Sequence, residues 1–181
     1  MFVERADLSG SVHCDVMMRS SFSQYLVTDL SDLCAMSLRD ARREAINDAA
    51  DVVALEYWLL GLVRSNVSDL RLLLEHLGVS TKDLIGRLHL TVGAVTIDED
   101  APSLIPPGRI HRLLEAAWLR ANFGIEARQR VRSSHLLMAL LDTPQVQLQS
   151  WSPLLSSVSS SAVAAAASKV TPLHGTREIW S

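Results

Sequence analysis

The sequence predicts an all-α fold, a pseudo-twofold duplicated four-helix motif with about eight helices in total. Three observations support this prediction. Apolar residues recur at the spacing of helical faces along most of the chain, segments typical of strands are almost absent, and the same pattern of helices occurs twice. Because each copy is too small to bury its own apolar face, we expect the two copies to pack against each other.

The duplication is visible in the first two helices of each copy. The first helix carries the pattern Leu-x-x-Ala-x-x-x-Ala, at residues 38–45 and 114–121, and the second carries an apolar segment, at residues 57–63 and 135–141. The first pair of segments is separated by 76 residues and the second pair by 78. We therefore predict that the connection between these helices is two residues longer in the second copy.

The first helical pattern follows residues 1–20, which we expect to form an N-terminal tail. Leu26, Leu30 and Leu33 have the spacing of one helical face. Cys34 continues this apolar stripe and is interpreted as a small buried hydrophobic residue. The stripe leads into repeat one.

Repeat one is expected to span about residues 34–95, with its second helix over residues 51–63. Asp69 favours the start of a third helix, and Gly78 favours its end because glycine tolerates the left-handed conformation. Ser80 or Thr81 then starts a fourth helix.

Residues 90–97 are the one segment that resembles an extended strand, and no partner strand is evident. Residues 96–108, with three prolines and an acidic cluster, are predicted to link the repeats. Repeat two is expected to span about residues 109–170, with an amphipathic helix over residues 109–123 and a second helix capped by Ser133 or Ser134.

The C-terminal part is less regular. Residues 151–155 are typical of a packed helix with proline in its first turn. Residues 156–169 are rich in Ser, Ala and Val, which is compatible with a linker but favours a final helix because alanine has a high helix propensity. Residues 171–181 are expected to be a tail or the start of a linker, so the domain is predicted over residues 21–170.

The composition is that of an ordinary globular protein. The 181 residues carry a formal net charge of −3, and two short arginine groups, at residues 39–43 and 128–132, are interpreted as solvated helix faces. This balance predicts neither a nucleic-acid partner nor an anionic membrane surface. No run of apolar residues approaches the length that a transmembrane helix needs, about 18 residues. Charged residues interrupt the N-terminal segment, where a signal peptide would need an apolar core. We therefore expect a cytoplasmic protein.

Motifs of catalysis are absent. The sequence contains no phosphate-binding loop of the GxxxxGK[ST] type, and no HExxH, paired CxxC or EF-hand spacing. His135, at the start of an apolar helix, is interpreted as a core or capping residue. Glu56 is interpreted as a first-turn carboxylate that stabilises a helix N-terminus. The sequence therefore predicts a non-enzymatic domain without a metal or a cofactor of its own.

The helix that precedes repeat one has no counterpart before repeat two. Its apolar residues are most simply explained as part of the core. An added amphipathic helix also breaks the pseudosymmetry, and it could form one wall of a groove that accepts a partner helix.

These motifs, in this order, resemble the N-terminal domain of the Clp family of AAA+ unfoldases, which consists of two copies of a four-helix motif. The similarity covers about residues 22–169. The second helix of each repeat begins like the Glu-His-Leu-Leu pattern of the family, at residues 55–60 and 135–137, although Tyr57 stands where histidine is usual.

Further features are similar to the ClpV branch, which serves bacterial type VI secretion. They are Trp58, residues 68–74 running into Gly78, and residues 113–119. The resemblance implies a substrate-recognition domain that binds a helix near the N-terminus of the larger sheath subunit, so that attached ATPase rings disassemble contracted sheath for reuse. ATP and a hexameric assembly would come only with AAA+ modules outside this sequence, and we expect the isolated domain to be monomeric.

The resemblance also implies a site. In the family the bound helix lies in an apolar groove between the added first helix and the segment that opens repeat two. Transferred to this chain, the groove residues are Leu26, Val27, Leu30, Leu104, Ile105 and Ile110. Two alternatives remain open, namely a general Clp N-domain or free-standing adaptor for other protein substrates, and a structural protein whose own tail fills the groove.

Overall fold

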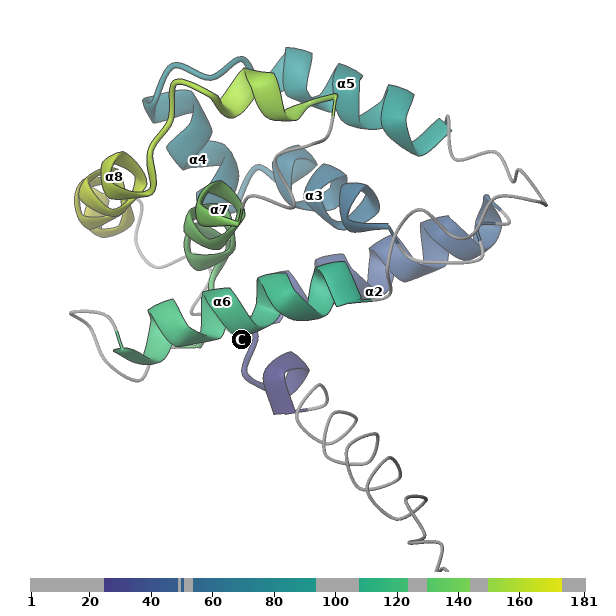
Figure 1. Ribbon diagram of the computed structural model, residues 1–181, viewed down its shortest axis with the longest axis horizontal. Helices are drawn as coiled ribbons and strands as arrows, with labels where there is room; N and C mark the ends of the chain where they lie inside the picture. Colours follow the sequence, from purple (N-terminus) through teal and green to yellow (C-terminus); the bar gives the residue numbers. More distant parts are fainter. Residues whose placement is uncertain are drawn as a thin grey trace, which may run out of the picture.

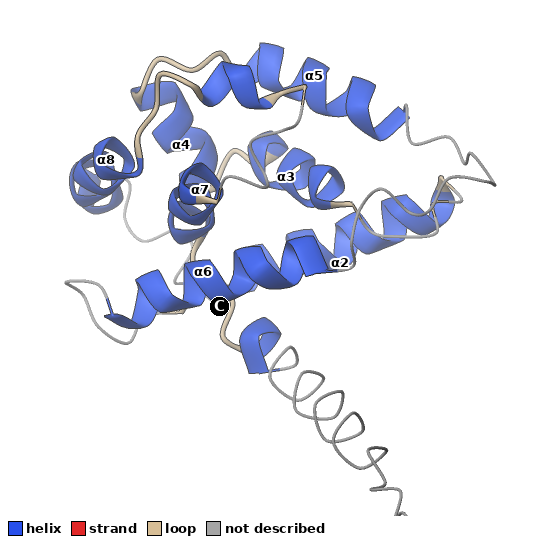
Figure 2. Ribbon diagram, viewed as in Figure 1, coloured by secondary structure: helices blue, strands red, loops and turns tan. Residues whose placement is uncertain are grey.

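The computed structural model confirms the all-α class. In the part of the chain that the structure describes, every regular element is a helix (Figure 2). No helix in that part is both long and apolar enough to cross a membrane. The described residues are 25–48, 50, 54–93, 108–123, 130–143 and 150–173.

The helix bounds reproduce the duplication. Helix α2 (Asp32–Asn47) and helix α6 (Gly108–Phe123) both contain 16 residues, and α3 (Leu55–Arg64) and α7 (Ser133–Asp142) both contain 10. The first pair is offset by 76 residues and the second by 78, so the predicted two-residue insertion between the helices is confirmed.

The remaining helices of each repeat pack in a similar order. Repeat one continues with α4 (Asp69–His76) and α5 (Thr81–Gly93), and repeat two with the 3₁₀ helix η2 (Ser152–Leu155) and α8 (Ser160–Leu173). Helix α3 packs on α2 and α5, and α7 packs on α6 and α8 (Figure 1). The repeats meet where α4 lies against α7 and α8, so α3 and α7 are the central helices.

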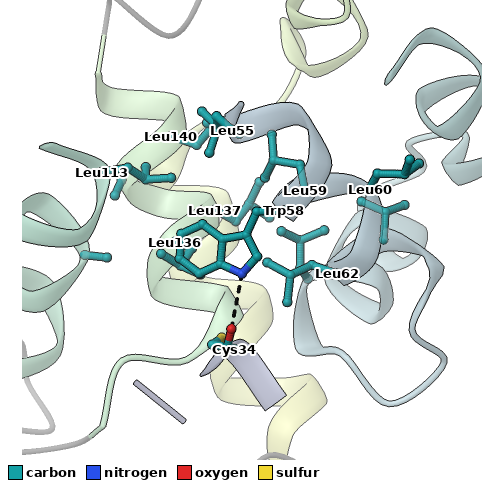
Figure 3. Packing of buried hydrophobic residues seen from close by; sticks show 14 of the residues in the cluster. Cys34, Leu55, Trp58, Leu59, Leu60, Leu62, Leu113, Leu136, Leu137 and Leu140 are labelled. Atoms are coloured by element: carbon teal, nitrogen blue, oxygen red, sulfur yellow. Dashed lines mark hydrogen bonds between the residues drawn. The ribbon is translucent and has the colours of Figure 1, made fainter. Parts of the chain in front are cut away.

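The core is shared by both repeats. The Trp58 side chain is fully buried, and its indole Nε1 donates a hydrogen bond to the carbonyl oxygen of Cys34 at 3.2 Å. Leu136 and Leu137 of α7 lie beside it (Figure 3), and Leu113 of α6 belongs to the same cluster. Residues of both repeats therefore contribute to one core.

Several helix ends follow their predicted residues. Gly78 ends the α4 region with a φ of 74°, and the backbone N–H of Asp83 donates to Ser80 Oγ at 3.2 Å at the start of α5. A glycine is favoured at this φ because a Cβ atom would be strained there.

The predicted extended segment at residues 90–97 is wrong over its described part, because α5 continues to Gly93. Leu88 is fully buried and Val92 packs against the core, so tertiary packing of one helical face overrides the local β-propensity. Residues 94–97 and the predicted linker up to residue 107 lie outside the described residues.

The first apolar stripe is not one continuous helix. A helical turn at residues 25–28 ends before Leu30, which forms an isolated parallel bridge with Val131. The Ser31 N–H donates to the Val131 carbonyl at 2.9 Å, and the Val131 N–H donates to the Asp29 carbonyl at 2.8 Å. Helix α2 then starts after Ser31, whose Oγ accepts from the Cys34 N–H. The leading segment is thus attached to repeat two.

The predicted serine cap of α7 is wrong. The residue before α7 is Arg132, and its backbone N–H donates to His135 Nδ1 at 3.1 Å, which confirms the capping interpretation of that histidine. Ser133 Oγ instead accepts the backbone N–H of Leu70 at 2.9 Å. This serine therefore joins α7 to the start of α4.

The C-terminal helix is confirmed, but with shifted bounds. Helix α8 begins at Ser160 and ends at Leu173, beyond the predicted start of the tail at residue 171. Among residues 160–169 of this helix, Val163 and Ala166 are buried, whereas Val158 precedes the helix. The predicted tail at residues 1–20 and residues 174–181 lie outside the described residues.

Candidate functional site

A groove of about 700 Å³ lies beside Leu30. The leading turn at residues 25–28 forms one wall, residues 32–42 of α2 form another, and the first turn of α6 closes one side. The apolar side chains that line it are those of Val27, Leu30, Ala35, Leu38 and Ile110.

Three long-range contacts position these walls. The Leu30–Val131 bridge attaches the leading segment to the residues before α7. Tyr25 packs edge-on against Trp118 of α6, with ring centroids 6.2 Å apart. Arg109, next to Ile110, forms an ion pair with the buried Glu56 of α3 at 3.4 Å.

The structure brings together three of the six predicted groove residues. Val27 is 40% exposed, Leu30 is 2% exposed and forms part of the floor, and Ile110 is partly buried at the start of α6. Leu26 is 0% exposed and belongs to the core, because neighbouring residues of a helical turn project about 100° apart. Leu104 and Ile105 lie outside the described residues. That these residues bind a partner stays a prediction.

Helix α2 contributes to the groove, which was not predicted from the sequence. Ala35 and Leu38 were assigned to the repeat, but both also line the groove. Ala35, Leu38, Arg39 and Arg42 recur at helical spacing, so they lie on one face of α2. This pattern could have indicated that α2 has a second face, separate from the one that packs in the core.

Charged side chains surround the apolar lining. Arg39, Arg42, Arg130 and Asp32 all border the groove. Asp32 and Arg130 form an exposed ion pair at 3.0 Å on this border. Arg39, Arg42 and Arg130 are exposed, as predicted for the arginine groups, but Arg130 precedes α7 and does not lie on a helix face. The prediction is wrong for Arg132, which is 7% exposed because it forms an ion pair with Asp69.

A second set of polar groups is buried between the repeats. Glu56 is 1% exposed, and its Oε1 atom accepts the indole N–H of Trp151 at 3.3 Å in addition to pairing with Arg109. Arg132 and Asp69 form a further buried ion pair at 2.6 Å. Glu56 does lie in the first turn of α3, as predicted, and it also ties α3 to repeat two.

Tyr57 stands where histidine is usual in the Clp N-domain family that the sequence resembles. Burial raises its pKa from 10.0 to about 12, and the hydrogen bond from its hydroxyl to Asp48 Oδ2 at 2.9 Å contributes to the rise. The phenol therefore stays neutral at ordinary pH and acts as a hydrogen-bond donor. Among the described residues, no group of three or more His, Cys, Asp or Glu side chains is placed to hold a metal ion.

Comparison with known proteins identifies the fold. No protein-family model and no curated protein matches the sequence. The structure is similar to the N-terminal domain of a ClpV ATPase of an E. coli type VI secretion system, with a TM-score of 0.67 and 24% identity over 87% of this chain and 93% of that one. The N-domain of ClpV from Vibrio cholerae gives a TM-score of 0.66 and 20% identity, over 82% and 88% of the two chains.

A third similar structure is a complex of a ClpV N-domain with a VipB peptide. Its TM-score is 0.57, with 24% identity over 74% of this chain and 79% of that one. These similarities extend over most of each chain and include both repeats. The chain therefore has the fold of the N-terminal domains of ClpV ATPases.

Proposed function

We propose that this chain is the substrate-recognition domain of a ClpV-like AAA+ unfoldase, and that it binds an N-terminal helix of the type VI secretion sheath subunit. The observation that carries the proposal is the apolar groove beside Leu30. The ClpV fold supports it, as does the peptide complex formed by one protein of the same fold.

The groove suits one face of an amphipathic helix. Its volume of about 700 Å³ can hold a few apolar side chains. An amphipathic helix binds such a groove by inserting the apolar side chains that it carries at positions i, i+3, i+4 and i+7. The partly exposed Val27, Leu38 and Ile110 provide apolar surface that the partner helix would cover. We expect a dissociation constant in the micromolar range, because a few buried side chains give about −8 kcal/mol after the cost of association.

In this role the domain does no chemistry. It captures the sheath subunit, and AAA+ modules of the full-length protein would hydrolyse ATP and pull the subunit out of contracted sheath, in the bacterial cytoplasm.

The proposal is tested by titrating the chain with a labelled peptide from the N-terminus of its own sheath subunit and measuring fluorescence anisotropy. Val27→Asp places a charge in the groove and is expected to weaken binding at least about tenfold, since it removes an apolar contact and leaves a desolvated carboxylate.

Val67→Asp is the matched control, because Val67 is 39% exposed in the α3–α4 connection and does not line the groove. Circular dichroism verifies that both variants are folded. The proposal is wrong if the folded wild type does not bind the peptide at several hundred micromolar, or if the two variants weaken binding equally.

A further inference from the structure

The border of the groove is positively charged although the chain as a whole carries a net charge of −3. Asp32 and Arg130 form an ion pair with each other at 3.0 Å. Arg39 and Arg42 remain as two exposed positive charges on the same border, and the groove lining contains no second carboxylate within the described residues.

The geometry of α2 separates these arginines from the acidic residues of the same helix. At about 100° per residue, Arg39 and Arg42 project within about 40° of Ala35, which lines the groove. Asp40 and Glu44 project about 140° and 180° away from Ala35. Asp40 forms an ion pair with Arg43 at 3.0 Å, and neither Asp40 nor Glu44 lines the groove, so Asp32 is the only carboxylate of α2 on its border.

We infer that the helix bound in this groove carries two carboxylates, one turn apart, along one edge of its apolar stripe, and that they pair with Arg39 and Arg42. This inference rests on the proposed function and specifies the partner. Arg39 and Arg42 are separated by about 4.5 Å along the axis of α2. Acidic residues at i and i+3 or i+4 of the bound helix have nearly the same axial spacing, so both pairs form together.

The arginines then decide which amphipathic helices bind. Each exposed ion pair changes affinity by about two- to fivefold, and a lysine at either position of the partner is repelled instead. Binding is expected to weaken with added salt. Salt screens the attraction between exposed charges, and the screening length is already about 10 Å at 0.1 M. A groove that was only apolar would show weak salt dependence.

The test compares Arg42→Glu with Arg43→Glu. The two residues are adjacent on α2 and undergo the same change of charge, but Arg43 is 73% exposed, pairs with Asp40 and does not line the groove. The probe is the N-terminal helix peptide of the sheath subunit, together with a version in which every Asp and Glu beside the apolar stripe is replaced by Asn or Gln.

We expect Arg42→Glu to weaken binding of the native peptide about tenfold at low salt, and Arg43→Glu to change it by less than about twofold. The amide peptide should bind the wild type about tenfold more weakly than the native peptide does, and Arg42→Glu should no longer be the weaker variant.

Two failures are distinguishable. In the first, the native peptide binds and Val27→Asp disrupts binding, so the proposed function stands. The charge inference is nevertheless overturned if Arg42→Glu and Arg43→Glu weaken binding equally, or if the peptide has no carboxylates beside its apolar stripe. If the native peptide does not bind the folded wild type, the proposed function falls and the inference falls with it.

Discussion

Repeat one and repeat two share their inner positions and differ on the outer faces of their first helices. Ala41 and Ala45 of α2 are buried, as are the corresponding Ala117 and Ala121 of α6. Buried alanines at these positions let each first helix approach the second helix of its repeat closely. The core of the duplicated motif is therefore retained in both copies.

The outer positions have diverged. Leu38 lines the groove, whereas the corresponding Leu114 is buried in the core. Arg42 is exposed at the groove border, whereas Trp118, 76 residues later, packs against Tyr25. The buried core is therefore common to both repeats, whereas the groove depends on the outer face of α2 and on the leading segment.

The second helices differ at their N-termini, and this gives the largest predicted effect. Glu56 of α3 is buried and paired, whereas the corresponding residue of α7 is Ser134. We expect Glu56→Ala to lower the free energy of unfolding by roughly 3–5 kcal/mol, because it leaves the Arg109 charge buried without its partner. Urea unfolding followed by circular dichroism measures this loss.

Asp40→Ala is the matched control, because it removes a carboxylate whose ion pair with Arg43 is exposed. Its effect should be below about 1 kcal/mol. Equal effects of the two variants would contradict the view that Glu56 ties the repeats together.

Tyr57 and His135 occupy the next corresponding positions, and Tyr57 predicts a pH dependence. Its pKa is raised to about 12 in the folded chain, from 10.0, chiefly by burial. The folded chain therefore holds a proton that the unfolded chain loses between these values. The stabilisation is fully present below about pH 10 and declines as pH rises toward 12.

Between pH 9 and pH 11 the wild type should lose about 1 kcal/mol more stability than Tyr57→Phe, which has no phenol to titrate. Urea unfolding of both proteins at the two pH values measures the difference. Parallel pH profiles would show that Tyr57 does not hold its proton in the folded chain.

The smallest predicted effects concern the α4–α5 region, where repeat two has the short η2 instead of an α-helix. Gly78→Ala should destabilise the fold by about 1 kcal/mol, because its φ of 74° strains a residue with a Cβ atom. Gly86→Ala should stabilise it by up to about 1 kcal/mol, because Gly86 lies inside α5 with nothing within 4 Å of an added Cβ. Thermal melts should therefore shift in opposite directions, and shifts of the same sign would contradict these assignments.

The sequence predicted the helices because their signals are local. Spacing of apolar residues located α2 to α7, and the repeat offset located the insertion between the first two helices of repeat two. The errors have long-range causes. Ser133 is a plausible cap by sequence, but it accepts a hydrogen bond from Leu70, 63 residues away.

The site was predicted only in part, for a similar reason. The bridge to Val131 breaks the leading helix, and this break decides that Val27 faces the groove while Leu26 faces the core. The arginines on the groove border were not predicted as part of the site, because an exposed charged residue on a helix usually has no partner. Only the fold shows that they lie beside an apolar groove. Ile110 lines this groove, and the family resemblance, not its spacing, had named it as a candidate; that it contacts a partner stays a prediction.

The central claim is that a partner helix occupies the groove beside Leu30. Methyl NMR of the chain during titration with the sheath-subunit peptide tests it most directly. We expect the largest shift changes at the methyl groups of Val27, Leu30, Leu38 and Ile110, which line the groove. Changes confined to Leu141, Leu155 and Val158, around a separate cavity between α7 and η2, with none at Leu30, would contradict the claim.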